Sequence, residues 1–402
     1  MHRSHPAHRA GHLGARTRTV LISGAGVAGP TLAYWLARHG YRPTVVERSG
    51  SVRSSGNPVD VRGPAVEVAE RMHVMPRLRE VATSVTDLVF LNPRGERVGR
   101  VDVGVLRQAS GSREVELPRG DLAAALYEAS RDSAEFVFGD SIATLNQDAH
   151  GVNVTFEHGV SRRFDLVIGA DGLHSTVRRL AFGPESDFVE PTGIWVATMP
   201  MPGAPTRAHE ILMHNMPGRL TSIHPSRGKA LVAFIFRDAS TVSFDPRDTE
   251  QHKRKLLEAY DGDVWRLPEL LSYVRETSEL YFDSVSRVRM TSWSRGRVAL
   301  LGDAASCVSL FGEGSSLAMS GAFSLANALA DTPDDPIMAF RRYEAEHRRL
   351  VMPKQEGVAL AAALLVPKTK EGITLRNWAT HLWPAAAAAA WAKRRVSSAT
   401  VS

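Results

Sequence analysis

The chain has 402 residues, which suits two closely packed domains better than one compact core. Its hydrophobic fraction of 43% and charged fraction of 23% are typical of a globular protein, and its 1 cysteine, Cys307, excludes an intrachain disulfide. The formal net charge is +6, but the arginines are spread along the whole chain and form no stripe with aromatic residues, so we expect no nucleic-acid partner.

The N-terminal residues 1–18 contain several His and Arg residues and no apolar run, which indicates a disordered leader and not a secretory signal. The apolar run at 358–366 ends at Pro367 and is far shorter than the ~20 residues that a membrane span needs. Together with the single cysteine, these features favour a cytoplasmic protein without a membrane partner.

A strand–helix–strand unit is predicted next. Residues 19–23, Thr-Val-Leu-Ile-Ser, predict a strand, and after a glycine-rich turn a helix is expected to about His39, where Gly40 ends it. Residues 43–46 predict a second strand. Strand, helix and strand within about thirty residues form a βαβ unit.

The turn of this unit reads Gly-Ala-Gly-Val-Ala-Gly. Gly24 permits the tight turn, Gly26 lets the backbone approach a pyrophosphate, and Gly29 allows close packing of helix on strand. Ala28 lies where the helix opens, and the free N–H groups of a helix N-terminus attract phosphates. Glu47, at the end of the second strand, is placed to accept hydrogen bonds from a ribose. The motif predicts dinucleotide binding but does not separate FAD from NAD.

Strands continue through the middle of the chain. Residues 165–170 and 297–301 predict two buried strands, and a helix is expected from about Ser315. Between them, strand-like runs such as 192–198 and 230–237 are punctuated by Pro and Gly. This middle stretch is interpreted as a β-rich insertion that roofs a pocket.

The C-terminal part is predicted to be helical after Pro336. Residues 338–351 have helical spacing, and residues 385–393 are rich in Ala, which has the highest helix propensity. The sequence contains no zinc-like cluster of Cys and His and no convincing Ser–His–Asp arrangement, so no metal site is predicted.

Two later motifs carry a resemblance to a known family. Residues 165–179 include Asp-Gly-Leu-His-Ser-Thr-Val-Arg-Arg, and residues 297–305 read Arg-Val-Ala-Leu-Leu-Gly-Asp-Ala-Ala. They resemble the Asp-Gly and Gly-Asp motifs of class A FAD-dependent monooxygenases, the para-hydroxybenzoate hydroxylase-like aromatic hydroxylases. The resemblance implies that Asp303, after Gly302, holds the ribityl chain of FAD. It places Asp171 and Arg178 near the FAD pyrophosphate and the visiting NAD(P)H.

The helix that follows the Gly-Asp motif starts with Gly-Glu-Gly-Ser-Ser. The N–H groups of this helix start would face the N1–C2 edge of the flavin and stabilise negative charge there, which assigns Gly314, Ser315 and Ser316 to cofactor binding. Gly312 is a flavin-adjacent and a substrate candidate. Residues 117–122, Leu-Pro-Arg-Gly-Asp-Leu, resemble a segment whose Arg contacts the flavin, so Arg119 is assigned there.

A further match is to the tetracycline-inactivating monooxygenases. Residues 56–61, Gly-Asn-Pro-Val-Asp-Val, resemble a stretch in which an Asp lies by the flavin N5 side, and this implies that Asp60 is adjacent to the flavin. Arg53 matches an Arg assigned to NADPH contact, with a solvated loop arginine as the alternative, and Arg48 is placed to pack on the adenosine. No catalytic side chain is assigned beyond these flavin-adjacent positions.

The expected fold is α/β: an FAD-binding, Rossmann-like three-layer domain with a β-sheet substrate domain and C-terminal helices. The expected boundaries, after the leader, are 19–188 and 280–335 for the FAD-binding domain, with roughly 88–105 joining the substrate sheet, 189–279 for the substrate domain and 336–402 for the helical segment.

The resemblance implies a monooxygenase that uses FAD and consumes NADPH or NADH. It would insert one oxygen atom from O2, through a flavin C4a-hydroperoxide, into an aromatic or polyketide-like small molecule. His214 and His224 are the substrate candidates in the middle domain, and exposed strand-edge residues are the alternative for both. Trp195, Phe234 and Phe236 line the pocket or belong to the core, and the core is favoured.

Two other functions stay open: an FAD-dependent reductase or dehydrogenase without oxygen transfer, and a non-catalytic protein that binds FAD and a ligand. A flavin-dependent halogenase is disfavoured because its Trp-x-Trp-x-Ile-Pro segment is absent. The family often reads Gly-Asp-Ala-Ala-His, then Pro, then Gly-Gln-Gly, whereas this chain has Ser306, Leu310 and Glu313 at the His, Pro and Gln positions.

Overall fold

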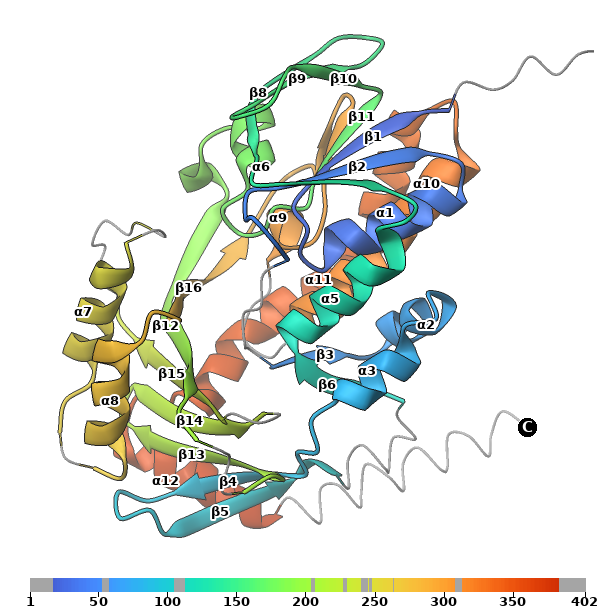
Figure 1. Cartoon of the computed structure of the whole chain (residues 1–402). Coiled ribbons are helices and arrows are strands. Elements are labelled where there is room, and N and C mark those ends of the chain that lie inside the picture. The colour runs from blue at the N-terminus through green and yellow to red at the C-terminus, as the bar shows by residue number, and fades with distance from the viewer. Residues whose placement is uncertain are drawn as a thin grey trace, which may run out of the picture.

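The computed structural model describes residues 17–52, 58–104, 113–203, 207–226, 230–239, 245, 248–262, 264–307 and 313–382. The predicted βαβ unit lies at the centre of a six-stranded sheet (Figure 1). β1 (Thr19–Ser23) pairs in parallel with β2 (Arg42–Glu47) on one side and with β11 (Leu166–Gly169) on the other. Their apolar runs are buried on both faces, as is usual for parallel strands.

The strand order of this sheet is β17-β18-β11-β1-β2-β7. Its remaining strands are β7 (Glu135–Phe138), β17 (Ser294–Arg295) and β18 (Val298–Leu300). The predicted strands at 19–23, 43–46, 165–170 and 297–301 are therefore confirmed, with small shifts at their ends.

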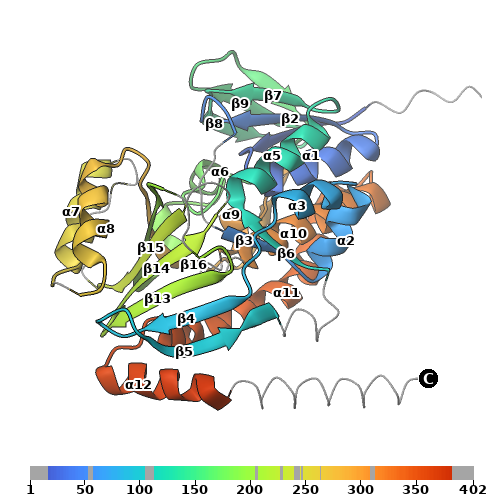
Figure 2. The same ribbon diagram turned by 60° about the horizontal axis from the view of Figure 1, so that its bottom comes forward.

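Two further layers cover this sheet. On one face lie α1 (Ala28–Arg38) and α10 (Glu313–Asp331), which pack against each other, with α5 (Arg119–Ser130) beside α1. On the other face lies an antiparallel sheet of three strands (Figures 1 and 2). Its strands are β8 (Ile142–Gln147), β9 (Val152–Phe156) and β10 (Arg162–Phe164).

The second large sheet has seven strands in the order β16-β12-β15-β14-β13-β4-β5. Its strands are β4 (Asp87–Leu91), β5 (Arg97–Asp102), β12 (Val189–Met201), β13 (Glu210–Met216), β14 (Arg219–Pro225), β15 (Ala230–Arg237) and β16 (Tyr281–Val288). One face is covered by α7 (Thr249–Ala259) and α8 (Leu267–Glu276), with which it forms a separate apolar core (Figure 1).

Smaller elements connect the two sheets. They are β3 (Pro58–Val61), β6 (Val115–Pro118), α2 (Pro64–Arg71), α3 (Met75–Val81), α6 (Thr176–Ala181), η1 (Glu185–Asp187) and α9 (Asp303–Ser306). β3 and β6 pair with each other.

The C-terminal helices contact both parts of the molecule. α11 (Pro336–Leu365) packs on α10, and near its end Arg237 of β15 donates to the carbonyl of Ala362 (2.8 Å) and to that of Val366 (2.8 Å). α12 (Lys370–Ala379) and η2 (Thr380–Leu382) follow beneath β13 and β5 (Figure 2). The predicted helix at 338–351 is confirmed, whereas the helix predicted at 385–393 lies outside the described residues.

Two observations lie close to the expected domain boundaries. β16 pairs with β12 and so continues the seven-stranded sheet beyond residue 280, because its alternating Tyr-x-Asp-x-Val pattern fits a half-buried sheet strand. Arg18, expected in the leader, donates to Asp334 (2.9 Å). The division into domains stays a prediction.

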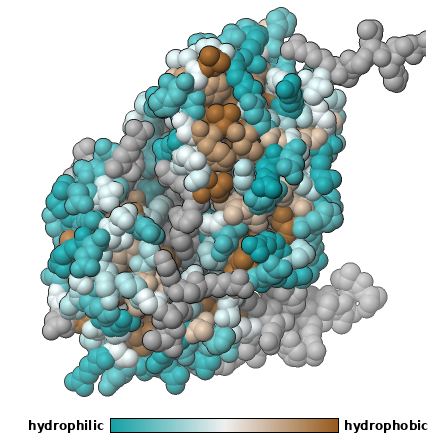
Figure 3. All heavy atoms as spheres, viewed as in Figure 1, coloured by the Kyte–Doolittle hydropathy of each residue, from teal (hydrophilic) through white to brown (hydrophobic). Residues whose placement is uncertain are grey.

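Most of the surface in Figure 3 is hydrophilic or neutral, with a smaller apolar patch in the upper middle of the view. Among the described residues, no single helix combines the length and the apolar character that crossing a membrane requires; α11 and α12 meet that test only as a pair bent by 99°.

Candidate functional site

A cavity of about 410 Å³ connects the glycine-rich turn after β1 with the seven-stranded sheet. Its walls come from the ends of β1 and β2, the loop after β11, the start of α5, α9 and α10, and the uncovered face of β12, β14, β15 and β16. Segments far apart in the sequence meet at this cavity, because the loops at the C-terminal edge of a parallel sheet lie close together. Predicted cofactor residues in its lining are Gly24, Gly26, Ala28, Glu47, Arg48, Arg119, Asp171, Asp303, Gly314 and Ser315.

The three turn glycines have different surroundings. A Cβ on Gly29 would lie 1.9 Å from the Gly24 carbonyl oxygen, and one on Gly24 (φ +105°) would lie 2.5 Å from the Ala170 carbonyl oxygen. A Cβ on Gly26 would meet nothing within 4 Å. Gly24 and Gly29 therefore serve the packing of strand, turn and helix, whereas Gly26 presents bare backbone to the cavity.

Glu47 is held in place by the same turn. Its carboxylate accepts hydrogen bonds from the N–H of Ala25 (2.9 Å) and from the N–H of Ser49 (2.9 Å). Each oxygen has a second lone pair, so the oriented carboxylate can still accept from the hydroxyls of a ribose. α1 starts at Ala28 with no acidic residue in its first turn, which leaves its positive end unopposed for a phosphate.

Asp171 shapes the loop after β11. Its carboxylate accepts from the hydroxyls of Ser23 (3.3 Å) and Ser175 and from the N–H of Val177 (3.1 Å). Burial raises the pKa of Asp171, and these hydrogen bonds oppose the shift. Although Asp171 lines the cavity, its hydrogen bonds fix the loop and α6, so its contact with a ligand remains a prediction.

Arg178 is placed differently from its predicted role. Its side chain is 1% exposed and does not line the cavity; it donates to the carbonyls of Ala304 (3.1 Å) and Leu173 and approaches Glu185 (3.3 Å). A guanidinium buried in this way supports the two motif loops from behind. The structure therefore gives no direct route from Arg178 to a visiting dinucleotide.

Asp303 stands at the first turn of α9, after Gly302 (φ +63°), and its side chain faces the cavity. Burial raises the pKa of Asp303, while the charge of Arg119 opposes the shift. Within the described ranges, no hydrogen bond to the Asp303 carboxylate is found. A desolvated acceptor in a cavity wall suits a polyol ligand that donates hydrogen bonds to it.

The start of α10 is fixed by an ion-pair network outside the cavity. Asp60 pairs with Arg62, Arg62 approaches Glu313 (3.5 Å), and Lys354 donates to Glu313 (2.7 Å). Ser316 donates to the backbone carbonyl of Asp60 (2.8 Å). Asp60, Ser316, Gly29 and Gly302 thus support the cavity without lining it, and Arg53, Leu310 and Gly312 lie outside the described residues.

The seven-stranded sheet presents two faces of different chemistry. In β15, Leu231, Ala233 and Ile235 line the cavity, whereas Phe234 and Phe236 belong to the core beneath α7 and α8. The alternation follows from the two-residue period of a strand. Trp195 lies on the same covered face, so the favoured interpretation of these aromatics as core is confirmed.

The same alternation separates the two histidines. His214 pairs with Thr221, which pairs with Phe234, so it lies on the covered face, where its ring packs at 5.8 Å from that of Trp265. Its assignment to substrate is therefore not supported. His224 does line the cavity; its Nε2 shares a hydrogen bond with the Ser222 hydroxyl (2.9 Å), and burial lowers its pKa to about 4.

The cavity residues that received no role from the sequence include Tyr281, Asp283 and His174. Tyr281 and Asp283 lie two apart on β16, next to Thr198 and Val196 of β12. His174 sits inside the Asp-Gly motif itself. A signal existed for the first two, since the Tyr-x-Asp-x-Val alternation puts them on one face, but the sequence does not say which face meets the cavity.

The described part of the chain holds no group of three or more His, Cys, Asp or Glu side chains arranged for a metal ion. The residues present instead fit a flavin dinucleotide. The turn at Gly26 and the start of α1 suit its pyrophosphate, Glu47 suits a ribose, and the desolvated Asp303 carboxylate suits a ribityl chain.

Comparisons with known proteins agree with this geometry. The family described as FAD binding domain matches residues 17–350. A flavin-dependent monooxygenase of Legionella longbeachae is 34% identical over 358 residues, which is 86% of this chain and 90% of that protein. The uncharacterized protein Rv1260 of Mycobacterium tuberculosis is 41% identical over 342 residues, covering 84% and 92%. The crystal structure of tetracycline destructase Tet(51) has a TM-score of 0.80 at 29% identity, covering 90% of this chain and 95% of that one.

The chain therefore belongs to the FAD binding domain family. It is an FAD-dependent monooxygenase, an oxidoreductase related to the class A enzymes. The resemblance and the fold class predicted from the sequence are confirmed.

Proposed function

We propose that this monooxygenase consumes NADPH or NADH and inserts one oxygen atom of O2 into an aromatic or polyketide-like small molecule. The observation that carries the proposal is the composition of one continuous cavity. At one end it offers the turn, carboxylates and helix starts that suit FAD, and at the other a wall of Val196, Leu231, Ala233 and Ile235. A flat apolar ring system suits a sheet face of aliphatic and small side chains.

FAD, when bound, would supply the electron transfer and the activation of oxygen. The chain's own residues would bind the cofactor and the substrate and orient them toward each other. The glycine turn and Glu47 hold the nucleotide end, and Asp303, Arg119 and the start of α10 hold the end nearest the sheet. The covered aromatic core keeps the sheet rigid behind the substrate, and the aliphatic wall excludes water from the reacting atoms.

Two solved structures with a similar fold are named tetracycline destructases. The proposal for this chain rests on the apolar character of the sheet-side wall, which suits a polycyclic ligand, and not on those names.

The test is NAD(P)H oxidation by the FAD-loaded protein with and without a panel of polycyclic phenols, followed together with O2 uptake and product mass. Oxidation that a phenol stimulates, with a gain of one oxygen atom in the product, is expected. Flavin reduction that never yields an oxygenated product with any panel member would favour a reductase. Absence of flavin reduction by either nucleotide would favour a binding protein.

A further inference from the structure

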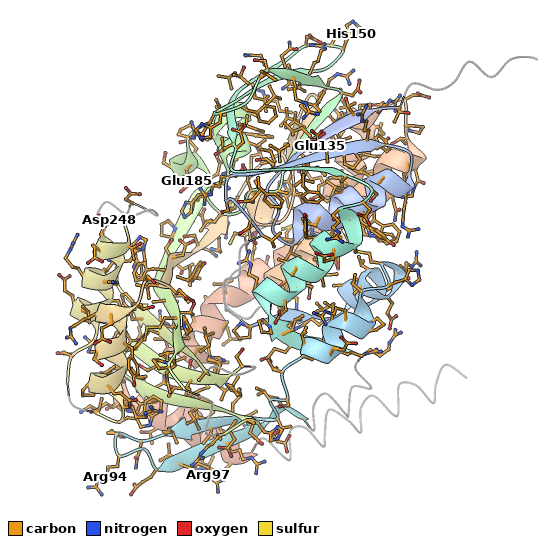
Figure 4. All side chains as sticks on the ribbon, viewed as in Figure 1. Arg94, Arg97, Glu135, His150, Glu185 and Asp248 are labelled. Carbon is orange, nitrogen blue, oxygen red and sulfur yellow. The ribbon has the colours of Figure 1, made fainter. Side chains whose placement is uncertain are left out.

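Three titratable side chains form a line of contacts from the cavity to the surface, and FAD binding as described above uses none of them. His174, in the loop after β11, places Nε2 3.4 Å from Asp283 Oδ1 and Nδ1 2.9 Å from Glu185 Oε1. Asp283 and His174 line the cavity, whereas Glu185 does not. The exposed fractions of the side chains are 19% for Asp283, 24% for His174 and 39% for Glu185. Figure 4 shows Glu185 at the outer side of the junction, where the chain enters β12.

Both carboxylates are anchored. Asp283 Oδ1 also accepts from the N–H of Ser284 (2.7 Å), and Glu185 Oε2 faces the buried Arg178 guanidinium (3.3 Å). The line therefore joins β16 of the seven-stranded sheet to the loop and the short helix η1 of the FAD-binding part. Its geometry is fixed by backbone and by a buried cation, as proton transfer between neighbouring groups requires.

The charge of His174 follows from this arrangement. Burial works to lower the pKa of His174, but the hydrogen bonds and charges of Asp283 and Glu185 outweigh it and raise the pKa to about 9. At neutral pH the imidazole is therefore a cation with a proton on each nitrogen. Burial acts to raise the pKa of Glu185, but His174 and Arg178 outweigh it and hold that pKa below its usual range.

Other cavity groups are less suited to give a proton. Burial raises the pKa of the Tyr281 hydroxyl well above its ordinary value, and burial lowers the pKa of His224 to about 4, so His224 is neutral and carries no exchangeable excess proton at neutral pH. His174 is thus protonated at neutral pH and is the group of the sheet-side wall that is suited to act as an acid.

We propose that His174, through Asp283, supplies the proton that each turnover consumes in the cavity, and that Glu185 recharges it from water. The inference rests on the proposed function. Insertion of one oxygen atom converts substrate, O2, NAD(P)H and one proton into oxygenated substrate, NAD(P)+ and water. NAD(P)H provides two electrons and the substrate two, and the second oxygen atom becomes water by taking up a proton that must reach the cavity.

The transfer is balanced as follows. The N–H bond at Nε2 breaks, its electron pair stays on the ring, and the proton binds Asp283 Oδ1. Asp283 then releases a proton to the acceptor in the cavity and is a carboxylate again. His174 is then neutral. Glu185 takes a proton from the solvent. Once the ring has turned its bare nitrogen toward Glu185, that nitrogen takes the proton, and Glu185 is a carboxylate again. All three side chains return to their starting charges.

The test measures the pH dependence of kcat with a phenol that the wild type oxygenates, together with a solvent isotope effect. A second readout, the NMR titration of the His174 imidazole, needs no turnover. Other titratable or charged groups face His174, Asp283 and Glu185 from neighbouring elements and must be considered in both titrations. They are Asp171, Arg178, Arg119, Asp303 and Tyr281.

In the wild type, kcat should fall as the pH rises through about 9, and His174 should titrate there. Asp283→Asn should lower kcat by about 10²-fold, a general-acid effect, and shift both titrations to lower pH. Glu185→Gln should also shift both titrations to lower pH, with a smaller loss of kcat. If Asp283→Asn fails to fold, Glu185→Gln alone tests the proposal. Glu135→Gln, which removes a carboxylate paired with Arg162 outside the cavity, is the control and should change neither readout (Figure 4).

A wild-type profile that Glu185→Gln and a folded Asp283→Asn both reproduce would overturn the proton supply while the monooxygenase function stands. Loss of FAD content in these variants, with kcat per bound flavin and the profile unchanged, would show a purely structural role and overturn it as well. If the wild type oxygenates no panel member, the proposed function itself fails and the inference with it.

Discussion

The two ends of the cavity are built by different means. At the nucleotide end the shape of the cavity depends on the backbone, because two glycines lie where a Cβ would meet a carbonyl oxygen. The polar groups there are backbone N–H groups and carboxylates held by hydrogen bonds. At the sheet end the cavity is shaped by side chains, because alternate residues of the same strands line the cavity on one face and belong to the aromatic core on the other. Substitutions at Gly24 and Gly29 should therefore affect folding and cofactor retention together, whereas substitutions at the sheet end should separate stability from specificity.

The largest expected effect concerns the alternation in β15. Phe234→Ala should lower the free energy of unfolding by about 3–5 kcal/mol, because the ring is fully buried beneath α7 and α8. Its neighbour Ala233 lines the cavity, so Ala233→Val should leave the thermal midpoint nearly unchanged and alter which phenols stimulate NAD(P)H oxidation. Calorimetry and the substrate panel check the pair; equal destabilisation by both variants would contradict the two-face account.

The next effect separates the turn glycines. Gly29→Ala should cost about 3 kcal/mol of stability and remove bound FAD, since its Cβ meets the backbone carbonyl of Gly24. Gly26→Ala has free space for its Cβ and should fold normally while it binds FAD more weakly. Thermal unfolding and the flavin-to-protein absorbance ratio measure the difference. A Gly29→Ala protein that purifies fully yellow would show that the turn tolerates rearrangement.

A smaller effect is expected at Asp303. Asp303→Ala should weaken FAD binding by about 10- to 100-fold, the range for lost hydrogen bonds to a charged group, and should leave the apoprotein folded. Flavin fluorescence titration measures it. Asp148→Asn, at an exposed ion pair with Arg163, is the matched control. Unchanged affinity in Asp303→Ala would remove Asp303 from the ribityl site.

The smallest effect is a pH dependence of stability. The pKa of His174 is raised in the folded state to about 9 from an ordinary value of 6.5, so its contribution is fully present below about pH 6.5 and is lost as the pH rises through 9. The difference in unfolding free energy between wild type and His174→Gln should shrink across that window. Urea unfolding at several pH values checks the sign, and a difference that grows with pH would be inconsistent with an imidazolium between two carboxylates.

Much of the nucleotide end could be predicted because its motif is local. Residues 19–47 form one βαβ unit, and its apolar runs together with the glycine spacing predict strand, turn and helix. Asp303 follows β18 in a second local motif, and its place in the cavity agrees with the expectation.

The sheet end could not be derived in the same way, because it depends on strand pairing between distant segments. His214 and His224 are both strand residues, and only the pairing through β14 and β15 shows which of them meets the cavity. Arg178 belongs to a correctly recognised motif, but the sequence could not predict that its side chain is buried against α9. The contact between His174 and Asp283 joins positions 109 residues apart.

The central claim is that one cavity holds FAD at one end and an oxygen acceptor at the other. The most direct measurement is turnover of the FAD-loaded protein with NAD(P)H and a stimulating phenol under isotopically labelled O2, followed by mass spectrometry of the product. The account predicts one labelled oxygen atom in each product molecule. Product without label, or nucleotide oxidation that yields only hydrogen peroxide with every substrate that binds, would contradict it.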